Sequence, residues 1–272
     1  MFTDNHLYTR YCDLLPRPRK AVTTLKLISY NIQVGIAANS LRDYIVGGWR
    51  HVLPDQARNN NLDHIADVLK DFDIVALQEV DGGSLRSGYV NQVEYLAERG
   101  DFPFCHTQLN RNFGRLGQHA NGMLTRIRPH HITNHRLPGM IPGRGAIMLR
   151  FGDAAEALVL IIAHLALGQR ARQRQLDYLA KLLQRHPNAI VMGDMNCTID
   201  QLHACGFLAR TALEPTNATR NTFPSWRPSR NIDHILVSRT LAAQHVEVLH
   251  HRYSDHLPVA LEINLPSKLL LE

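Results

Sequence analysis

The stretch IVMGDMN, residues 190–196, is the one from which the fold can be worked out. Its apolar run is too short for a helix and begins with two β-branched residues, which is typical of a buried strand. The strand meets a glycine and then presents Asp194 and Asn196, whose side chains lie on the same side of an extended chain. A carboxylate and a carboxamide at one strand end suit metal and water chemistry at a phosphate. The alternative is an Asp turn that only caps the next helix.

Similar strand ends elsewhere in the chain favour the chemical interpretation. In α/β sheets, ligands bind at the edge where the strands stop and the loops open. Several predicted strands carry a polar residue at such an end, which would be a coincidence if each were only a turn. These residues are Asn31 (strand 25–33), Glu79 (74–79), His164 (157–164), Asp233 (231–237) and Asp255-His256 (before the last strand).

The remaining pattern alternates strands with helices. Apolar residues recur at helical spacing over 58–71, 90–100 and 169–185, and a short helix is expected over 198–205. Further strands are expected over 104–109, 121–126 and 145–151, with a glycine- and arginine-rich loop over 110–120 and a long irregular segment over 34–57. No linker or repeat divides the chain, so we expect an irregular lead-in over 1–24 and a single domain over 25–272.

The composition is that of an ordinary globular protein, with 44% hydrophobic and 20% charged residues among 272. The four cysteines form no CxxC pair, which indicates reduced thiols in an intracellular protein. The first twenty residues contain no apolar core typical of a signal peptide, and no apolar run approaches the roughly 18 residues of a membrane helix. We therefore expect a cytoplasmic monomer without a transmembrane segment.

The positive charge is unevenly placed. The net charge is +6 and the isoelectric point about 9.3. No Asp or Glu occurs from Phe102 to Gly152, a stretch that holds Arg115 and Arg144, or from Pro215 to Ile232. This segregation suggests a positive surface facing an anion, and a solvated face with counter-charges from elsewhere is the alternative.

Seven strings in the chain together closely resemble the endonuclease/exonuclease/phosphatase superfamily, which includes pancreatic-type deoxyribonucleases and bacterial sphingomyelinases. They occur in the family's order over residues 25–264, and the string from Thr222 to Ser225 is similar to small bacterial members. The resemblance implies an α/β fold, a four-layer sandwich of two packed mixed β-sheets flanked by helices, as in deoxyribonuclease I. The strings are SYNIQ, LQEVD, NGMLTR, AHLAL, VMGDMN, NIDHILVS and SDHLPV.

The resemblance also implies a metal site. Asn31 and Glu79 would lie at the ion, with Glu79 the principal ligand, and Asp255 would help to hold it. Because these ligands are carboxylate and amide oxygens, we expect Mg²⁺, with Mn²⁺ as the second choice.

The same resemblance implies the catalytic roles. Asp194 would orient or deprotonate the attacking water, and Asn196 would hold that water or a phosphate oxygen. His256, braced by Asp233, would contact the phosphate, and His164 would donate a hydrogen bond or a proton, although no carboxylate partner for it is evident. The substrate-binding candidates are Asn121, Arg115, Arg144 and Trp226, with Trp226 and Trp49 as stacking residues for a base.

The leading hypothesis is a divalent-metal phosphodiesterase that acts on DNA or RNA with little sequence specificity. The first alternative keeps the chemistry and changes the substrate to a phospholipid or a small phosphoester. The second is a non-catalytic binding protein on the same fold, which is disfavoured because every position needed for the chemistry holds a competent residue.

Overall fold

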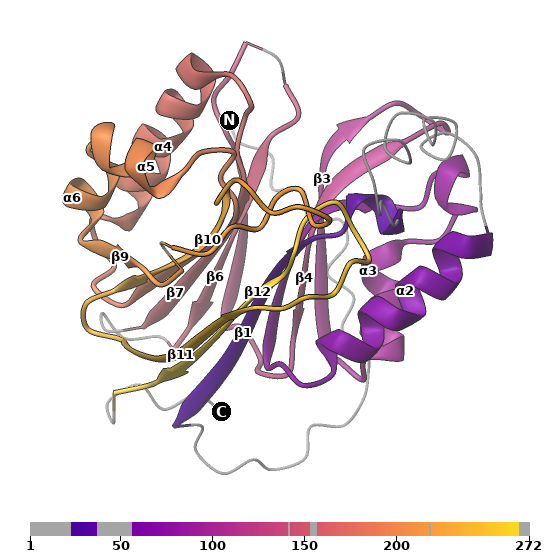
Figure 1. The fold of residues 1–272 in the computed structure, drawn as a ribbon, viewed down its shortest axis with the longest axis horizontal. Coiled ribbons are helices and arrows are strands. Elements are labelled where there is room, and N and C mark those ends of the chain that lie inside the picture. Colours follow the sequence, from indigo (N-terminus) through magenta and orange to yellow (C-terminus); the bar gives the residue numbers. More distant parts are fainter. Residues whose placement is uncertain (1–22, 37–55, 141, 153–156, 218, 267–272) are drawn as a thin grey trace.

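The computed structural model describes residues 23–36, 56–140, 142–152, 157–217 and 219–266. Most of the expected lead-in over 1–24, most of the segment 34–57 and Trp49 therefore lie outside the described residues. The described strands form two six-stranded sheets, which lie between two groups of helices (Figure 1).

The first sheet has the strand order β11-β12-β1-β2-β4-β3. β1 and β2 are parallel and the other neighbours are antiparallel. Helices α2 and α3 cover the outer face, where Leu62, Ile65 and Val93 pack against Ile28 and Leu77. The elements are β1 (Thr24–Asn31), β2 (Ile74–Asp81), β3 (Phe104–Asn112), β4 (Gln118–Thr125), β11 (Ala242–Val248), β12 (Val259–Asn264), α2 (Gln56–Leu69) and α3 (Gln92–Arg99), with 3-10 turns at Gln33–Gly35 and Leu85–Ser87.

The second sheet has the order β5-β6-β7-β8-β10-β9 and is also mixed, with β7 and β8 parallel. Helices α4, α5 and α6 cover its outer face, where Leu176, Leu179 and Phe207 pack against Val159 and Val191. The elements are β5 (His131–Arg136), β6 (Gly145–Phe151), β7 (Leu158–His164), β8 (Ala189–Asp194), β9 (Leu213–Pro215), β10 (Asp233–Ser238), α4 (Gln169–Leu183), α5 (Ile199–Ala204) and α6 (Phe207–Thr211).

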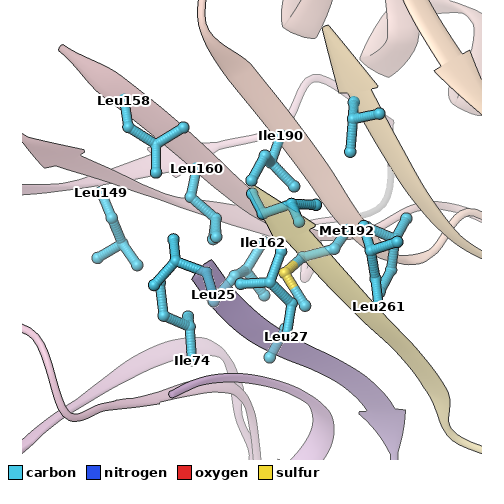
Figure 2. Packing of buried hydrophobic residues seen from close by; sticks show 14 of the residues in the cluster. Leu25, Leu27, Ile74, Leu149, Leu158, Leu160, Ile162, Ile190, Met192 and Leu261 are labelled. Carbon is cyan, nitrogen blue, oxygen red and sulfur yellow. The ribbon is translucent and has the colours of Figure 1, made fainter. Parts of the chain in front are cut away.

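The two sheets pack face to face through an apolar core. Leu25 and Leu27 of β1 point toward Ile162 of β7 and Met192 of β8, with Leu261 of β12 beside them (Figure 2). Because both faces of the central strands are buried, β7 is apolar at every position before His164. The predicted four-layer sandwich is confirmed. Among the described residues, no helix has both the length and the apolar character needed to cross a membrane.

Several elements differ from the sequence prediction. The loop expected over 110–120 is shorter, because β3 continues to Asn112 and β4 begins at Gln118. Strands β5, β9 and β11 and helix α6 were not expected. β5 and β11 lie at sheet edges and are largely exposed, so they lack the apolar alternation that marks a strand.

Candidate active site

The predicted site residues meet where the parallel strands of both sheets end. In the second sheet, Asp194 pairs with His164 on one side and Asp233 on the other. In the first sheet, Asn31 at the end of β1 pairs with Gln78, the residue before Glu79. The Asn31 amide donates to the Asp194 carboxylate at 3.1 Å, and this hydrogen bond joins the two sheets at the site.

A β-bulge positions Glu79. The pairing of β2 with β4 shifts register between Leu77 and Val80, and Glu79 itself has a φ of 55°. A bulge inserts an extra residue and so re-aims a side chain. The Glu79 side chain is 35% exposed, whereas the other acids of the site are almost fully buried, and its Oε1 lies 3.9 Å from His164 Nε2. Glu79 is therefore the acid at the site that is most open to solvent.

Asp194 is held by its backbone as well as by Asn31. Its Oδ1 accepts a hydrogen bond from the Asn196 amide N–H at 2.9 Å. The preceding Gly193 has a φ of 142°, and a Cβ at that position would lie 1.9 Å from the carbonyl oxygen of Ala163. Only glycine fits this approach between β7 and β8. Burial, assisted by the charge of Asp233, raises the pKa of Asp194 to about 7, the range in which a general base is effective.

His256 and Asp233 form a buried pair. Nδ1 of His256 lies 3.0 and 2.9 Å from the two carboxylate oxygens of Asp233, which also accepts a hydrogen bond from Thr222 Oγ1. Burial lowers the pKa of His256, but the charges of Asp233, Asp194 and Asp255 outweigh it and raise the pKa to about 10. The imidazole is therefore cationic at neutral pH, and its Nε2 lies 3.9 Å from Asp194 Oδ2.

Asp255 adds a third acid beside this pair. Its Oδ1 is 4.0 Å from His256 Nε2 and accepts a hydrogen bond from the hydroxyl of Ser254. Burial and the nearby charge of Glu79 raise the pKa of Asp255 to about 6, although His256 opposes this. A cation bound beside Asp255 would favour its ionised form.

The donor set at the site fits a hard divalent cation. Glu79 and Asp255 offer carboxylate oxygens, and Asn31 is oriented because its Oδ1 accepts from the Gln33 N–H at 3.2 Å. The tightest group of ligand-type atoms is a different one, because atoms of Asp194, Asp233 and His256 lie within 4.8 Å of one another. That group serves a cation poorly, because the protonated His256 is already bonded to Asp233.

His164 contacts an arginine rather than a carboxylate. Nη1 of Arg144 lies 2.9 Å from Nδ1 and 2.8 Å from Nε2 of His164, while Asp194 Oδ2 is 3.5 Å from Nε2. A guanidinium only donates, so the imidazole ring accepts and is neutral. Burial, followed by the charge of Arg144, holds the pKa of His164 well below its usual value. This arrangement suits a hydrogen-bonding role better than that of an acid.

Asn196 and Trp226, two further predicted residues, lie in segments that border the site. Asn196 has a φ of 52°, and its amide donates to the Leu165 carbonyl oxygen at 2.9 Å. Trp226 is half-buried in a segment that lies against the site, since the Ser225 N–H donates to the Asp255 carbonyl oxygen at 2.7 Å.

Two of the substrate-binding candidates lie on the β3–β4 hairpin, where Asn121 stands opposite the bulge that carries Glu79. Arg115 is exposed in the turn between β3 and β4. Asn121 is fully buried, and its amide donates to the Gly145 carbonyl oxygen at 3.0 Å, so its observed contact joins β4 to β6.

Sequence reasoning did not assign several residues that support the site. Thr222 holds Asp233, although it lies in a string noted above. A further network follows Glu79: Asp81 is fully buried, pairs with Arg86 and accepts from the Ser84 N–H at 2.6 Å and the Ser87 hydroxyl at 3.0 Å. This network fixes the segment after β2, and no local pattern distinguishes Arg86 from a surface arginine.

Comparison with known proteins identifies the group of proteins that this chain resembles. A family model described as the Endonuclease/Exonuclease/phosphatase family matches residues 28–256. No curated protein sequence matches the chain.

Solved structures share the fold. An endonuclease/exonuclease/phosphatase from Beutenbergia cavernae is similar with a TM-score of 0.68 and 17% identity, covering 90% of this chain and 72% of the other. The mannosyl-6-phosphatase of Bacteroides thetaiotaomicron has a TM-score of 0.64 and 19% identity, covering 89% and 100%. D. rerio TDP2 complexed with a single-strand DNA product has a TM-score of 0.64 and 17% identity, covering 90% and 100%.

Proposed function

The chain belongs to the endonuclease/exonuclease/phosphatase family, whose members hydrolyse phosphoester bonds, and from this premise we propose that it is a divalent-metal-dependent phosphodiesterase that acts on nucleic acid. The observation that carries the proposal is the convergence of Glu79, Asp194 and His256 at one edge of the two sheets. A carboxylate open to solvent, a base with a pKa of about 7 and an imidazolium meet there, and each can contribute to the hydrolysis of a phosphodiester.

In this proposal, Asp194 activates the nucleophile. Its Oδ2 takes a proton from a water molecule, while the hydrogen bonds from Asn31 and the Asn196 N–H hold the carboxylate in place. Asn196 supplies its Oδ1 to orient that water, because its amide nitrogen is committed to Leu165.

His256 faces the developing negative charge on the phosphate. Asp233 binds Nδ1, so Nε2 carries the proton that is offered to a phosphate oxygen. Arg144 adds a second positive charge on the opposite side of Asp194, and the neutral His164 positions its guanidinium.

Glu79, Asp255 and Asn31 would hold the divalent ion, Mg²⁺ or Mn²⁺. When bound, such an ion polarises the phosphoryl group and stabilises the charge that develops in the transition state. The donor set supports this assignment, because all three residues offer oxygen and two are carboxylates whose charges repel one another without a cation.

Nucleic acid is the substrate that the charge distribution favours. The net charge is +6, and the two stretches without acidic residues include the β3–β4 hairpin and the segment around Trp226. The similarity in fold to D. rerio TDP2 complexed with a single-strand DNA product agrees with this choice. We also propose that the protein is a monomer and acts in the cytoplasm.

A small phosphoester is the second candidate. The similarity in fold to the mannosyl-6-phosphatase of Bacteroides thetaiotaomicron supports it. A phospholipid headgroup belongs to the same alternative, since the chemistry at the scissile bond would be the same.

A substrate panel tests the proposal. Purified protein with Mg²⁺ is incubated with single- and double-stranded DNA, abasic DNA, RNA, sphingomyelin and inositol phosphates, with Asp194→Asn as the matched inactive control. We expect cleavage of DNA or RNA by the wild type and none by Asp194→Asn. Turnover of a small phosphoester with no cleavage of any nucleic acid would replace the first candidate by the second.

A further inference from the structure

A second β-bulge lies on the hairpin beside the site. The pairing of β3 with β4 passes from Leu109 opposite Ala120 directly to Arg111 opposite His119, so Asn110 is an extra residue. An extra residue interrupts the alternation of a strand, so that Arg111 can face the same side as Gln108 and Asn110. That side faces the second sheet, since Gln108 Nε2 donates to the Ala146 carbonyl oxygen at 3.2 Å.

The Arg111 side chain packs against Gly143, the residue before Arg144. A Cβ on Gly143 would lie 3.1 Å from Cδ and 3.2 Å from Cβ of Arg111, so the side chain of Arg111 passes close over this glycine. The guanidinium of Arg111 then lies 4.4 Å from the centroid of the Phe113 ring, which is 48% exposed. A cation over an aromatic face is held in place without losing its charge.

Among the described residues, neither Arg111 nor Arg144 makes a direct ion pair with a carboxylate, and this sets them apart from four paired arginines. Each of these four arginines pairs with one acid: Arg86 with Asp81, Arg99 with Asp63, Arg210 with Asp177 and Arg239 with Glu214. In the described part of the chain, Arg144 contacts the neutral ring of His164, and Arg111 lies over the face of Phe113. The positive charges of Arg111 and Arg144 lie close enough to repel each other, and an anion bound between them relieves this repulsion.

Arg144 lies nearer to Asp194 than Arg111 does, so the two arginines would contact successive parts of a bound substrate. Arg144 touches His164, which is 3.5 Å from Asp194, so Arg144 lies beside the scissile phosphate. Arg111 lies one residue further out, over Gly143 and toward the exposed tip of the β3–β4 hairpin. An anion at Arg111 is thus a neighbour of the scissile group rather than the group itself.

We propose that Arg111, aimed by the bulge at Asn110 and supported by Phe113, forms with Arg144 a subsite for the phosphate next to the scissile one. This inference rests on the proposed phosphodiesterase function and specifies its substrate, a strand with at least two consecutive phosphates. The planar guanidinium, with its fork of donors, matches phosphate oxygens better than a lysine would.

The experiment compares two substrates that differ in this neighbouring phosphate. Oligothymidylate carries it, whereas bis(4-nitrophenyl) phosphate has a single phosphodiester. We expect Arg111→Ala to lower kcat/KM for oligothymidylate about tenfold, mainly through KM, and to leave hydrolysis of bis(4-nitrophenyl) phosphate unchanged. Arg111→Lys should recover part of the loss. Arg239→Ala removes the same charge from an exposed ion pair after β10 and should change neither rate.

A binding measurement separates the subsite from catalysis. Fluorescence anisotropy of a labelled oligothymidylate is recorded in chelator for the wild type, Arg111→Ala and Arg239→Ala. Loss of one phosphate contact should weaken binding about tenfold and make the slope of log K against log salt shallower by about 0.7. If Arg111→Ala binds like the wild type, or lowers turnover of both substrates alike, the subsite is wrong. If binding depends on Arg111 but the wild type cleaves no oligonucleotide, the proposed nuclease function fails and the subsite stands.

Discussion

Replacing Asp233 by Asn removes one charge from the buried pair and little else. Asp233 is 1% exposed and His256 is 6% exposed, and their atoms are 2.9 Å apart. Asparagine has nearly the same shape, so its Oδ1 still accepts the hydrogen bond from Thr222. The substitution therefore tests the charge of Asp233 rather than the packing around it.

The size of the effect follows from the pKa of His256. Burial alone would lower this pKa, yet the neighbouring acids, Asp233 foremost, raise it from 6.5 to about 10. At about 1.4 kcal/mol for each pKa unit, the folded protein favours the imidazolium by roughly 5 kcal/mol. Without Asp233, only Asp194 and Asp255 still oppose the effect of burial, so the pKa of His256 falls and the imidazolium contributes less to the transition state at pH 7. We expect kcat to fall about 10²- to 10³-fold, the usual cost of one lost donor to a developing oxyanion.

The assay is the pH dependence of bis(4-nitrophenyl) phosphate hydrolysis with Mg²⁺. The raised pKa of His256 also contributes stability that is fully present below pH 6.5 and is lost as the pH rises through about 10. Thermal unfolding should therefore show the wild type losing stability across this interval and Asp233→Asn lacking that loss. A folded Asp233→Asn protein with a kcat within threefold of the wild type and the same pH profile would refute the assignment of His256 as the imidazolium.

The remaining predictions concern other parts of the structure. Asp194→Asn should reduce diester hydrolysis about 10²- to 10⁴-fold at unchanged melting temperature, and normal turnover would remove the proposed base. Gly193→Ala should cost about 3 kcal/mol or more in urea unfolding, because its Cβ would collide with Ala163; a wild-type midpoint would contradict the observed strand approach. Burial raises the pKa of Asp81, but its hydrogen-bond partners, Arg86 foremost, outweigh burial and lower this pKa. The contribution of Asp81 to folding stability should therefore be present above pH 3.8 and be lost as the pH falls further. Arg86→Ala should reduce this loss of stability at acid pH, as measured by unfolding across the pH range. The same pH dependence of stability in Arg86→Ala and the wild type would contradict the stabilising role of the Asp81–Arg86 pair. Oligonucleotide binding should weaken steeply with salt, and a flat response would favour a small phosphoester.

The central strands could be predicted from the sequence alone, whereas the sandwich that they form was implied by the family resemblance. β7 and β8 are buried on both faces and end in His164 and Asp194, so a continuous apolar run and a polar terminus mark each one. The order of the strands within each sheet was not predicted. Edge strands such as β11, which is largely exposed, lack such an apolar run and were not predicted.

The site was predictable at strand ends and less so where the backbone is irregular. Glu79 and Arg111 both depend on β-bulges, and one extra residue in a ladder leaves no mark in the sequence of either strand. The partner of His164 was not predicted, because Arg144 approaches from the position just before β6, twenty residues earlier in the chain. Contacts between distant segments that are not part of a ladder have no sequence periodicity to reveal them.

The central claim is that Glu79, Asp194 and His256 act with one divalent cation on a scissile phosphodiester. It is tested most directly by the rate of bis(4-nitrophenyl) phosphate hydrolysis in chelator-treated protein as Mg²⁺ is added back. We predict no measurable rate before addition, a saturable recovery in the wild type, and a rate in Asp194→Asn that stays about 10²-fold or more below the wild-type rate at any Mg²⁺ concentration. A full rate in the presence of chelator, or an equal recovery in Asp194→Asn, would contradict it.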